Sequence, residues 1–116
     1  MALVLGHITF DCQSPPELAE FWAAALGAEV NEGGNEFFTS LDDHQSDRPS
    51  WFFIKVPEEK AGKNRLHVDL TADDRESEVA RLIALGATRG SDHREWGAEW
   101  SVLQDPEGNE FCVGQN

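Results

Sequence analysis

The stretch RLHVDLTADDRESEVARLIALGATRG, residues 65–90, contains the pattern that decides the fold. Apolar and polar residues alternate over 66–71, which predicts a half-buried strand. Asp73 or Asp74 can then cap a helix whose apolar stripe falls at positions 79, 82 and 83. Gly86 is placed where glycine commonly ends a helix. The stretch therefore predicts a strand that leads directly into an amphipathic helix.

The same pattern occurs near the start of the chain. Residues 4–12, VLGHITFDC, alternate like a strand, and PPELAEFWAAALG follows with prolines at the first helical positions and a closing glycine. His7 aligns with His67, and Gly27 aligns with Gly86, so one residue is gained or lost between the copies. The chain therefore contains two copies of one supersecondary unit.

Three short strands are expected after each helix. They fall at 28–31, 36–41 and 51–56 in the first copy, and at 87–90, 99–103 and 109–113 in the second. The sequence thus predicts an α+β fold in which two βαβββ modules, 1–60 and 61–116, share a single domain over 1–116. The join, PEEKAGK, is a charged turn.

Composition excludes several classes of partner. Twenty-two acids against nine Lys and Arg give a formal charge of -13, and no basic cluster interrupts the excess. Nucleic acid and anionic membrane surfaces would be repelled. The N-terminus resembles neither a signal peptide nor a membrane span, so we expect a cytoplasmic protein with two reduced cysteines, Cys12 and Cys112.

The strand faces predict a pocket. One face of the predicted strands is apolar, and it should pack on the helices. The other face carries polar side chains, which are costly to bury unless water, a metal or a ligand occupies the space they line. These residues are His7, Thr9, Asp11, His67, Asp69, Glu110 and Cys112. Two histidines at equivalent repeat positions and a carboxylate could hold Zn, Fe, Ni or Mn.

The aromatic residues favour an organic ligand. Phe52 and Ile54 share the pocket parity of the first module and cannot bind a cation, which makes that wall apolar. Trp100 is expected to line the cavity, where flat aromatic walls suit planar or apolar ligands. Trp22 is expected in the core, and His44 and His93 in solvated loops.

The motifs LGHITF, FWAAALG, RLHVDL, IALGA and DPEGNEF cover nearly the whole chain. In this order they resemble the vicinal oxygen chelate superfamily, which includes glyoxalase I, extradiol dioxygenases and antibiotic-resistance binding proteins. The similarity is strongest to its small glyoxalase-like branch. The resemblance implies strands curled into a half-barrel around a cavity, helices outside, and a homodimer.

The resemblance also implies metal ligands on the first and fourth strands of each module. His7 and His67 match the first-strand positions. The fourth-strand position of the second module is Cys112 instead of the usual glutamate, with Glu110 two residues earlier on the same face. The Cys112 thiolate could bind a soft metal, and Glu110 could shift in as a ligand. In the first module, Phe52 and Ile54 replace the ligand.

Three functions stay open from the sequence. The first is a metal-dependent lyase, isomerase or dioxygenase that acts on a small oxygen-bearing substrate, with Glu110 as third ligand or general base. The second is a metal-free protein that binds a small molecule or sequesters an antibiotic. The third is a metal-free enzyme in which His67 and Glu110 form an acid-base pair.

Overall fold

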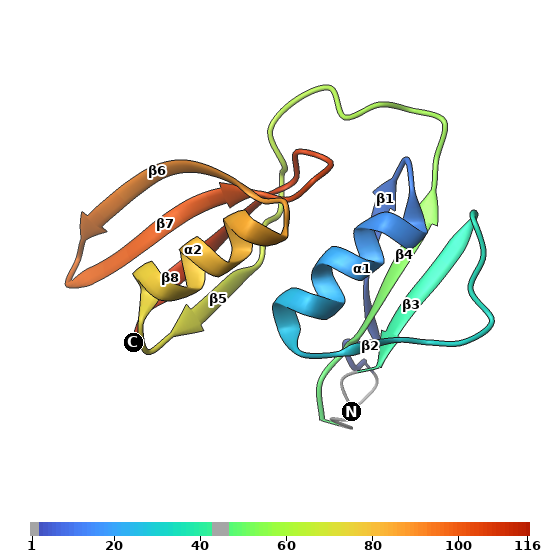
Figure 1. Ribbon diagram of the computed structural model, residues 1–116, viewed down its shortest axis with the longest axis horizontal. Coiled ribbons are helices and arrows are strands. Elements are labelled where there is room, and N and C mark those ends of the chain that lie inside the picture. The colour runs from blue at the N-terminus through green and yellow to red at the C-terminus, as the bar shows by residue number, and fades with distance from the viewer. Residues whose placement is uncertain (1–2, 43–46) are drawn as a thin grey trace. The chain divides into compact units, whose positions relative to one another are not determined.

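The computed structural model describes residues 3–42 and 47–116. The chain divides into two compact units, Met1–Glu59 and Lys60–Asn116. Each unit consists of one strand, one helix and three further strands, which are labelled in Figure 1. The α+β class and the doubled βαβββ order predicted from the sequence are therefore confirmed.

The first unit is a four-stranded mixed sheet with one helix. Its elements are β1 (His7–Cys12), α1 (Pro15–Leu26), β2 (Glu29–Val30), β3 (Phe38–Asp42) and β4 (Ser50–Lys55). The strand order across the sheet is β1-β4-β3-β2, and β1 pairs in parallel with β4. Helix α1 packs on β2, β3 and β4.

The second unit repeats this arrangement. Its elements are β5 (Asp69–Ala72), α2 (Arg75–Leu85), β6 (Thr88–Glu95), β7 (Ala98–Gln104) and β8 (Glu110–Gln115). The strand order is β5-β8-β7-β6, with β5 parallel to β8 and the other pairs antiparallel. Helix α2 contacts all four strands, and Figure 1 shows it lying across one face of this sheet.

Local residue chemistry sets the ends of the helices. Asp74, one of the two caps that the sequence allowed, accepts a hydrogen bond from the backbone N–H of Ser77 at 3.1 Å. The pKa of the Asp74 carboxyl lies below its usual value because the Ser77 hydroxyl and N–H both donate to it. Helix α1 begins with prolines and ends at Gly27, whose φ of +68° is the left-handed conformation that glycine adopts readily.

The apolar strand faces form the core of each unit. In the first unit Trp22 of α1 is fully buried, and its ring lies 5.6 Å from that of Phe10 and 5.1 Å from that of Trp51. In the second unit Phe111 and Val113 of β8 are only 1% and 2% exposed. The alternation in the sequence therefore identifies the buried face of β8 correctly. It fails at Val4 and Leu66, which precede the observed strands and are 92% and 75% exposed.

The strand boundaries differ from the predictions at two places that matter for the site. Strand β5 begins at Asp69, so His67 lies in an extended segment just before it. Strand β6 continues to Glu95, so His93 lies in a strand and our expectation of a loop was wrong. Every residue of β6 is exposed, so its sequence carries no burial signal. His44 lies outside the described residues.

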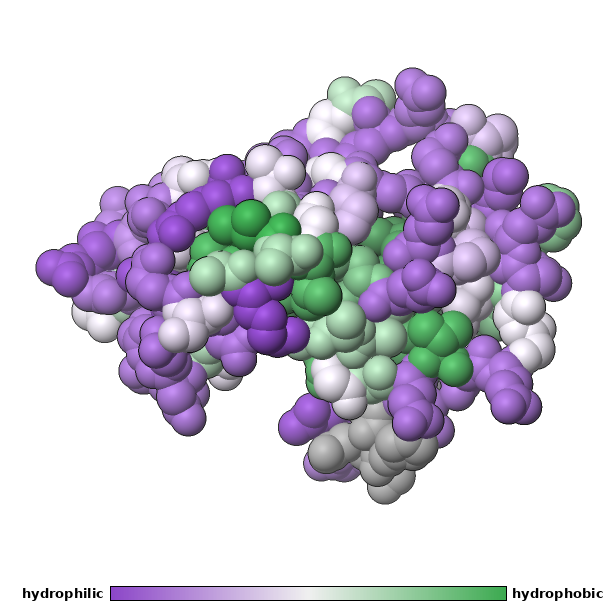
Figure 2. All heavy atoms as spheres, viewed as in Figure 1, coloured by the Kyte–Doolittle hydropathy of each residue, from purple (hydrophilic) through white to green (hydrophobic). Residues whose placement is uncertain are grey.

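The acid excess of the sequence is visible at the surface. Hydrophilic residues cover much of the face shown in Figure 2. Neither α1 nor α2 combines the length and the apolar character that a bilayer-spanning helix requires.

Truncation of Phe111 should unfold the second unit at lower denaturant. Because this ring is 1% exposed, Phe111→Ala should lower the free energy of unfolding by about 3–5 kcal/mol. Phe37→Ala is the matched control, since Phe37 is 60% exposed and its loss should change stability by less than about 1 kcal/mol. Urea titration followed by circular dichroism measures both, and equal effects would contradict the assigned core.

Candidate functional site

One face of the second sheet carries the functional side chains. Parallel pairing places Asp69 opposite Cys112, and antiparallel pairing places Val102 opposite the same cysteine. Since residues two apart on a strand share a face, Glu110 and Trp100 lie on this side as well. The other side of the sheet faces α2, because Ser101 of β7 accepts a hydrogen bond from Arg75, the first residue of the helix.

This face borders a hollow of about 400 Å³. That volume is within the range of small-molecule sites, about 300–1,000 Å³. The lining residues are Lys63, His67, Asp69, His93, Trp96, Trp100, Val102, Glu110 and Cys112. The sequence analysis predicted His67, Asp69, Trp100, Glu110 and Cys112 among these, and it missed Lys63, His93 and Val102.

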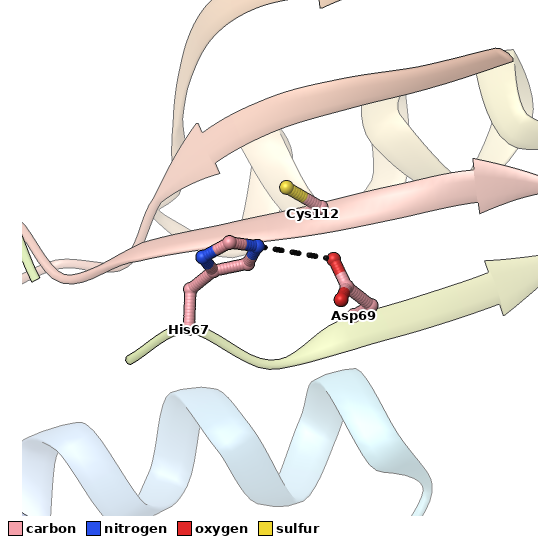
Figure 3. Close-up of side chains that lie close together, drawn as sticks. All are labelled: His67, Asp69 and Cys112. Atoms are coloured by element: carbon pink, nitrogen blue, oxygen red, sulfur yellow. Dashed lines mark ion pairs between the residues drawn. The ribbon is translucent and has the colours of Figure 1, made fainter. Parts of the chain in front are cut away.

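Three different ligand atoms meet on this face. The imidazole of His67, the carboxylate of Asp69 and the thiol of Cys112 lie with their ligand atoms within 4.8 Å of one another. His67 Nε2 is 3.4 Å from Asp69 Oδ1. Figure 3 shows the side chain of Cys112 on β8, that of Asp69 at the start of β5 and that of His67 on the segment before it, close to one another. Asp69 was predicted as a pocket residue, and its place beside His67 and Cys112 makes it a candidate ligand too.

This donor set fits a borderline-soft divalent metal. Zinc accepts nitrogen, oxygen and sulfur ligands at about 2.0–2.3 Å, so tetrahedral ligand atoms lie about 3.3–3.8 Å apart. The His67–Asp69 distance of 3.4 Å already meets this requirement. The Cys112 sulfur lies within 4.8 Å of the other two ligand atoms, so small side-chain movements would bring it into the same tetrahedron. Three protein ligands would leave a position free for a substrate.

The Cys112 thiol is protonated at neutral pH without a metal. Burial, together with the negative charge of Asp69 that disfavours the thiolate, raises the pKa of Cys112 to about 11. The side chain is only 7% exposed. A protonated, buried thiol is a poor nucleophile, so the free cysteine is inert unless a cation displaces its proton.

The Glu110 carboxylate is already engaged by neighbouring groups. Its Oε1 accepts a hydrogen bond from the backbone N–H of Asn64 at 2.8 Å, and Lys60 Nζ lies 3.1 Å from the same oxygen. Burial alone would raise the pKa of Glu110, but the hydrogen bonds and the Lys60 ammonium outweigh it and lower that pKa. Glu110 lines the hollow as an ion-paired carboxylate.

An aromatic wall borders the hollow on the β6–β7 hairpin. The rings of His93 and Trp100 are nearly parallel, with centroids 5.2 Å apart, and Trp96 stacks on Trp100 at 6.1 Å. Trp96 and Gly97 form a two-residue turn with positive φ at both positions, +53° and +77°. Such values are expected in a type I′ hairpin but are rare for tryptophan. Trp96 is also 89% exposed, so neither burial nor backbone preference explains why a tryptophan occupies this turn position.

A polar network behind the sheet fixes the hairpin to α2. Arg75 Nη1 donates to the Ser101 hydroxyl at 2.6 Å, and that hydroxyl donates to Asp92 at 2.7 Å. The pKa of Asp92 is lowered by the hydrogen bond from Ser101 and by the Arg89 guanidinium. Because Asp92 precedes His93 in β6, this network helps to hold the aromatic wall in place.

The corresponding face of the first unit combines polar residues of β1, His7 among them, with apolar residues of β4. The His7 ring stacks on Phe52 with centroids 4.2 Å apart, and Thr9 is the direct register partner of Phe52. Ile54 pairs with Asp11 on the same face. The predicted parity of Phe52 and Ile54 with the polar residues of β1 is therefore correct. Their role in a substrate pocket, and that of His7 as a metal ligand, stay predictions.

The protonation state of Cys112 can be tested directly. In a Cys12→Ser background, titration of the thiolate absorbance should give a midpoint of about 11. Asp69→Asn should lower this midpoint, because it removes a negative charge that opposes the thiolate. A midpoint at the ordinary cysteine value in the parent would contradict the buried environment described above.

The sequence matches the family model for a glyoxalase-like domain over residues 7–114. Among curated proteins, none matches it at a significant level. A glyoxalase/bleomycin resistance protein/dioxygenase family enzyme from Burkholderia phytofirmans PsJN has a similar fold, with 19% identity, 97% of this chain and 98% of that chain covered, and a TM-score of 0.81.

Two further crystal structures share the fold. The genomically encoded fosfomycin resistance protein FosX from Listeria monocytogenes is 14% identical, with 100% and 95% of the chains covered and a TM-score of 0.77. A glyoxalase/bleomycin resistance protein/dioxygenase superfamily member from Sphaerobacter thermophilus DSM 20745 is 16% identical, with 100% of both chains covered and a TM-score of 0.72. With the family model spanning both βαβββ units, the chain belongs to the glyoxalase-like domain family.

Proposed function

We propose that the hollow of the second unit binds a small, planar, oxygen-bearing molecule beside a divalent metal held by His67, Asp69 and Cys112. The proposal rests on one observation: nitrogen, oxygen and sulfur ligand atoms lie within 4.8 Å of one another beside a hollow that also has an aromatic wall. An open space lined by aromatic rings beside the ligand atoms is typical of a site that binds a small molecule, and a purely structural group of side chains does not require one.

Each residue has a separate task in this proposal. His67 and Asp69 supply a nitrogen and an oxygen ligand, and Cys112 supplies a thiolate after it loses its proton on metal binding. The metal, when bound, supplies Lewis acidity that polarises a substrate oxygen. Trp100 and His93 hold the planar part of the molecule by stacking.

The names of the structural neighbours support an enzyme that acts on a small molecule. One is a glyoxalase/bleomycin resistance protein/dioxygenase family enzyme, another is a fosfomycin resistance protein, and a third is the oxidase ChaP-H2. Family resemblance adds His7 as a ligand, Glu110 as a ligand or base, and a homodimer. These three expectations stay predictions, as do zinc, iron, nickel or manganese as the identity of the metal.

A metal-free binding protein is the second candidate. Two observations favour it: the pKa of Cys112 is raised to about 11, and the Glu110 carboxylate is bound by Asn64 and Lys60. In that case His67 and Asp69 would hydrogen-bond the ligand, and the stacked rings would supply most of the contact area.

Metal content separates the two candidates. Untagged protein purified without chelators should contain about one divalent ion per chain by mass spectrometry, as a three-ligand site predicts. His67→Ala, Asp69→Ala and Cys112→Ala should each lower this content, because each removes one ligand. Since Cys112 must lose a proton, metal affinity should also rise with pH, and this rise should weaken in the cysteine variant.

The same measurement tests His7. A loss of metal in His7→Ala would support the ligand role that the family implies, whereas unchanged content would limit the site to the second unit. Metal-free parent protein that takes up no zinc, cobalt or iron on titration would contradict the metal site and leave the binding-protein candidate.

The shape of the ligand can be tested with two matched probes. Benzamide and cyclohexanecarboxamide carry the same polar group, but only benzamide is planar. Benzamide should bind more tightly by calorimetry, because stacking on an aromatic side chain favours a flat ring by about 0.5–1.5 kcal/mol. Trp100→Ala should remove this preference, and Trp100→Leu should do the same while keeping apolar bulk.

Trp100→Phe is the matched control, since it keeps an aromatic face, and it should retain most of the preference. Equal affinity for both probes in the parent would contradict a stacking wall. Repeating the titration with chelator present shows whether the bound metal contributes, because the metal-free candidate predicts no change.

A further inference from the structure

We infer that Glu110 is a positioning residue, which fixes the segment before β5 so that His67 reaches Asp69 and Cys112. The inference rests on the proposed metal site and assigns Glu110 a role that differs from those of a ligand or a general base.

The side-chain contacts of Glu110 lead to one segment, residues 60–64. Its carboxylate Oε1 accepts from the backbone N–H of Asn64 at 2.8 Å, and its backbone carbonyl accepts from Asn64 Nδ2 at 3.3 Å. Lys60 Nζ donates to Oε2 at 3.2 Å and also to the carbonyl of Gly62. Side chain and backbone of Glu110 therefore both hold the stretch that precedes His67.

The His67 segment has little other support. Leu66 is 75% exposed, and the His67 side chain is 44% exposed, so burial does not fix their positions. The next anchor along the chain is the backbone carbonyl of Val68, which accepts from the N–H of Cys112 at 3.0 Å. Residues 65–67 are therefore held from Asn64 on one side and Val68 on the other. Loss of the first anchor would leave the imidazole on a loosely held strand end.

The charge state of Glu110 agrees with an anchoring role. The opposing effect of burial is outweighed by the Asn64 N–H and by Lys60, so its pKa lies below the usual value. A carboxylate that is already hydrogen-bonded and ion-paired in this way is a weaker proton acceptor than a free one.

Two variants separate anchoring from direct participation. Glu110→Gln keeps an oxygen that can accept from the Asn64 N–H, whereas Glu110→Ala removes it. Hydrogen exchange on metal-free protein should show the Asn64 amide about tenfold or more faster in the alanine variant, since a bond to a charged acceptor is lost. Zinc affinity should fall about 10–100-fold in Glu110→Ala, as for other residues that orient a metal ligand. Glu110→Gln should stay near the parent in both measurements.

Other results would overturn the inference. An unchanged Asn64 amide in Glu110→Ala would mean that the contact does not fix the segment. Equal loss of zinc affinity in both variants, with Asn64 protected in Glu110→Gln, would make Glu110 a ligand. Parent-like zinc affinity in both variants would mean that Glu110 does not position His67 for the metal.

Failure of the metal site itself gives a different result. If His67→Ala binds zinc as tightly as the parent, the proposed site is wrong. The exchange rate of the Asn64 amide still reports whether Glu110 holds the segment, because that measurement needs no metal.

Discussion

The parallel pairing of β5 with β8 is the constraint on which the second unit depends. Its register sets Asp69 beside Cys112, although 43 residues separate them in the sequence (112 − 69). Because side chains alternate across a sheet, this one register also decides that Phe111 and Val113 enter the core. A slip by one residue would turn the thiol toward α2 and the phenylalanine toward the hollow. Core and candidate site are therefore fixed by the same backbone hydrogen bonds.

Two acidic or weakly acidic groups on the same face of β8 are held in opposite states. Burial and the nearby Asp69 keep Cys112 protonated, with its pKa raised to about 11. Glu110, two residues earlier, stays ionised because Asn64 and Lys60 stabilise its charge. Cys112 is thus a group that a bound cation could deprotonate, whereas the Glu110 carboxylate is already bound by Asn64 and Lys60. Proximity in the sequence does not imply a shared chemical role.

The repeat and the alternation were sufficient to predict the fold, because core burial follows period-2 and helical patterns directly. They also predicted that His67, Asp69, Glu110 and Cys112 share one face. His93 could not be found this way, since β6 is exposed throughout and is held by its ladder with β7. The hydrogen bond between Glu110 and Asn64 could not be predicted from the sequence either, because Asn64 lies in a segment with no regular secondary structure. The predicted strand 87–90 ended at Gly90, whereas β6 continues to Glu95. Gly90 lies close to the Val102 carbonyl oxygen, which would be only 2.9 Å from a Cβ at that position.

The central claim is that an imidazole, a carboxylate and a thiolate can enclose one divalent ion in the second unit. Cobalt(II) reports on this directly, because its absorption spectrum depends on ligand type and geometry. Cobalt added to metal-free protein should produce a thiolate-to-cobalt charge-transfer band that is absent in Cys112→Ser, together with the intense visible bands of a low-coordinate site. A spectrum identical to that of cobalt in water, at protein concentrations well above those of the metal, would contradict the account.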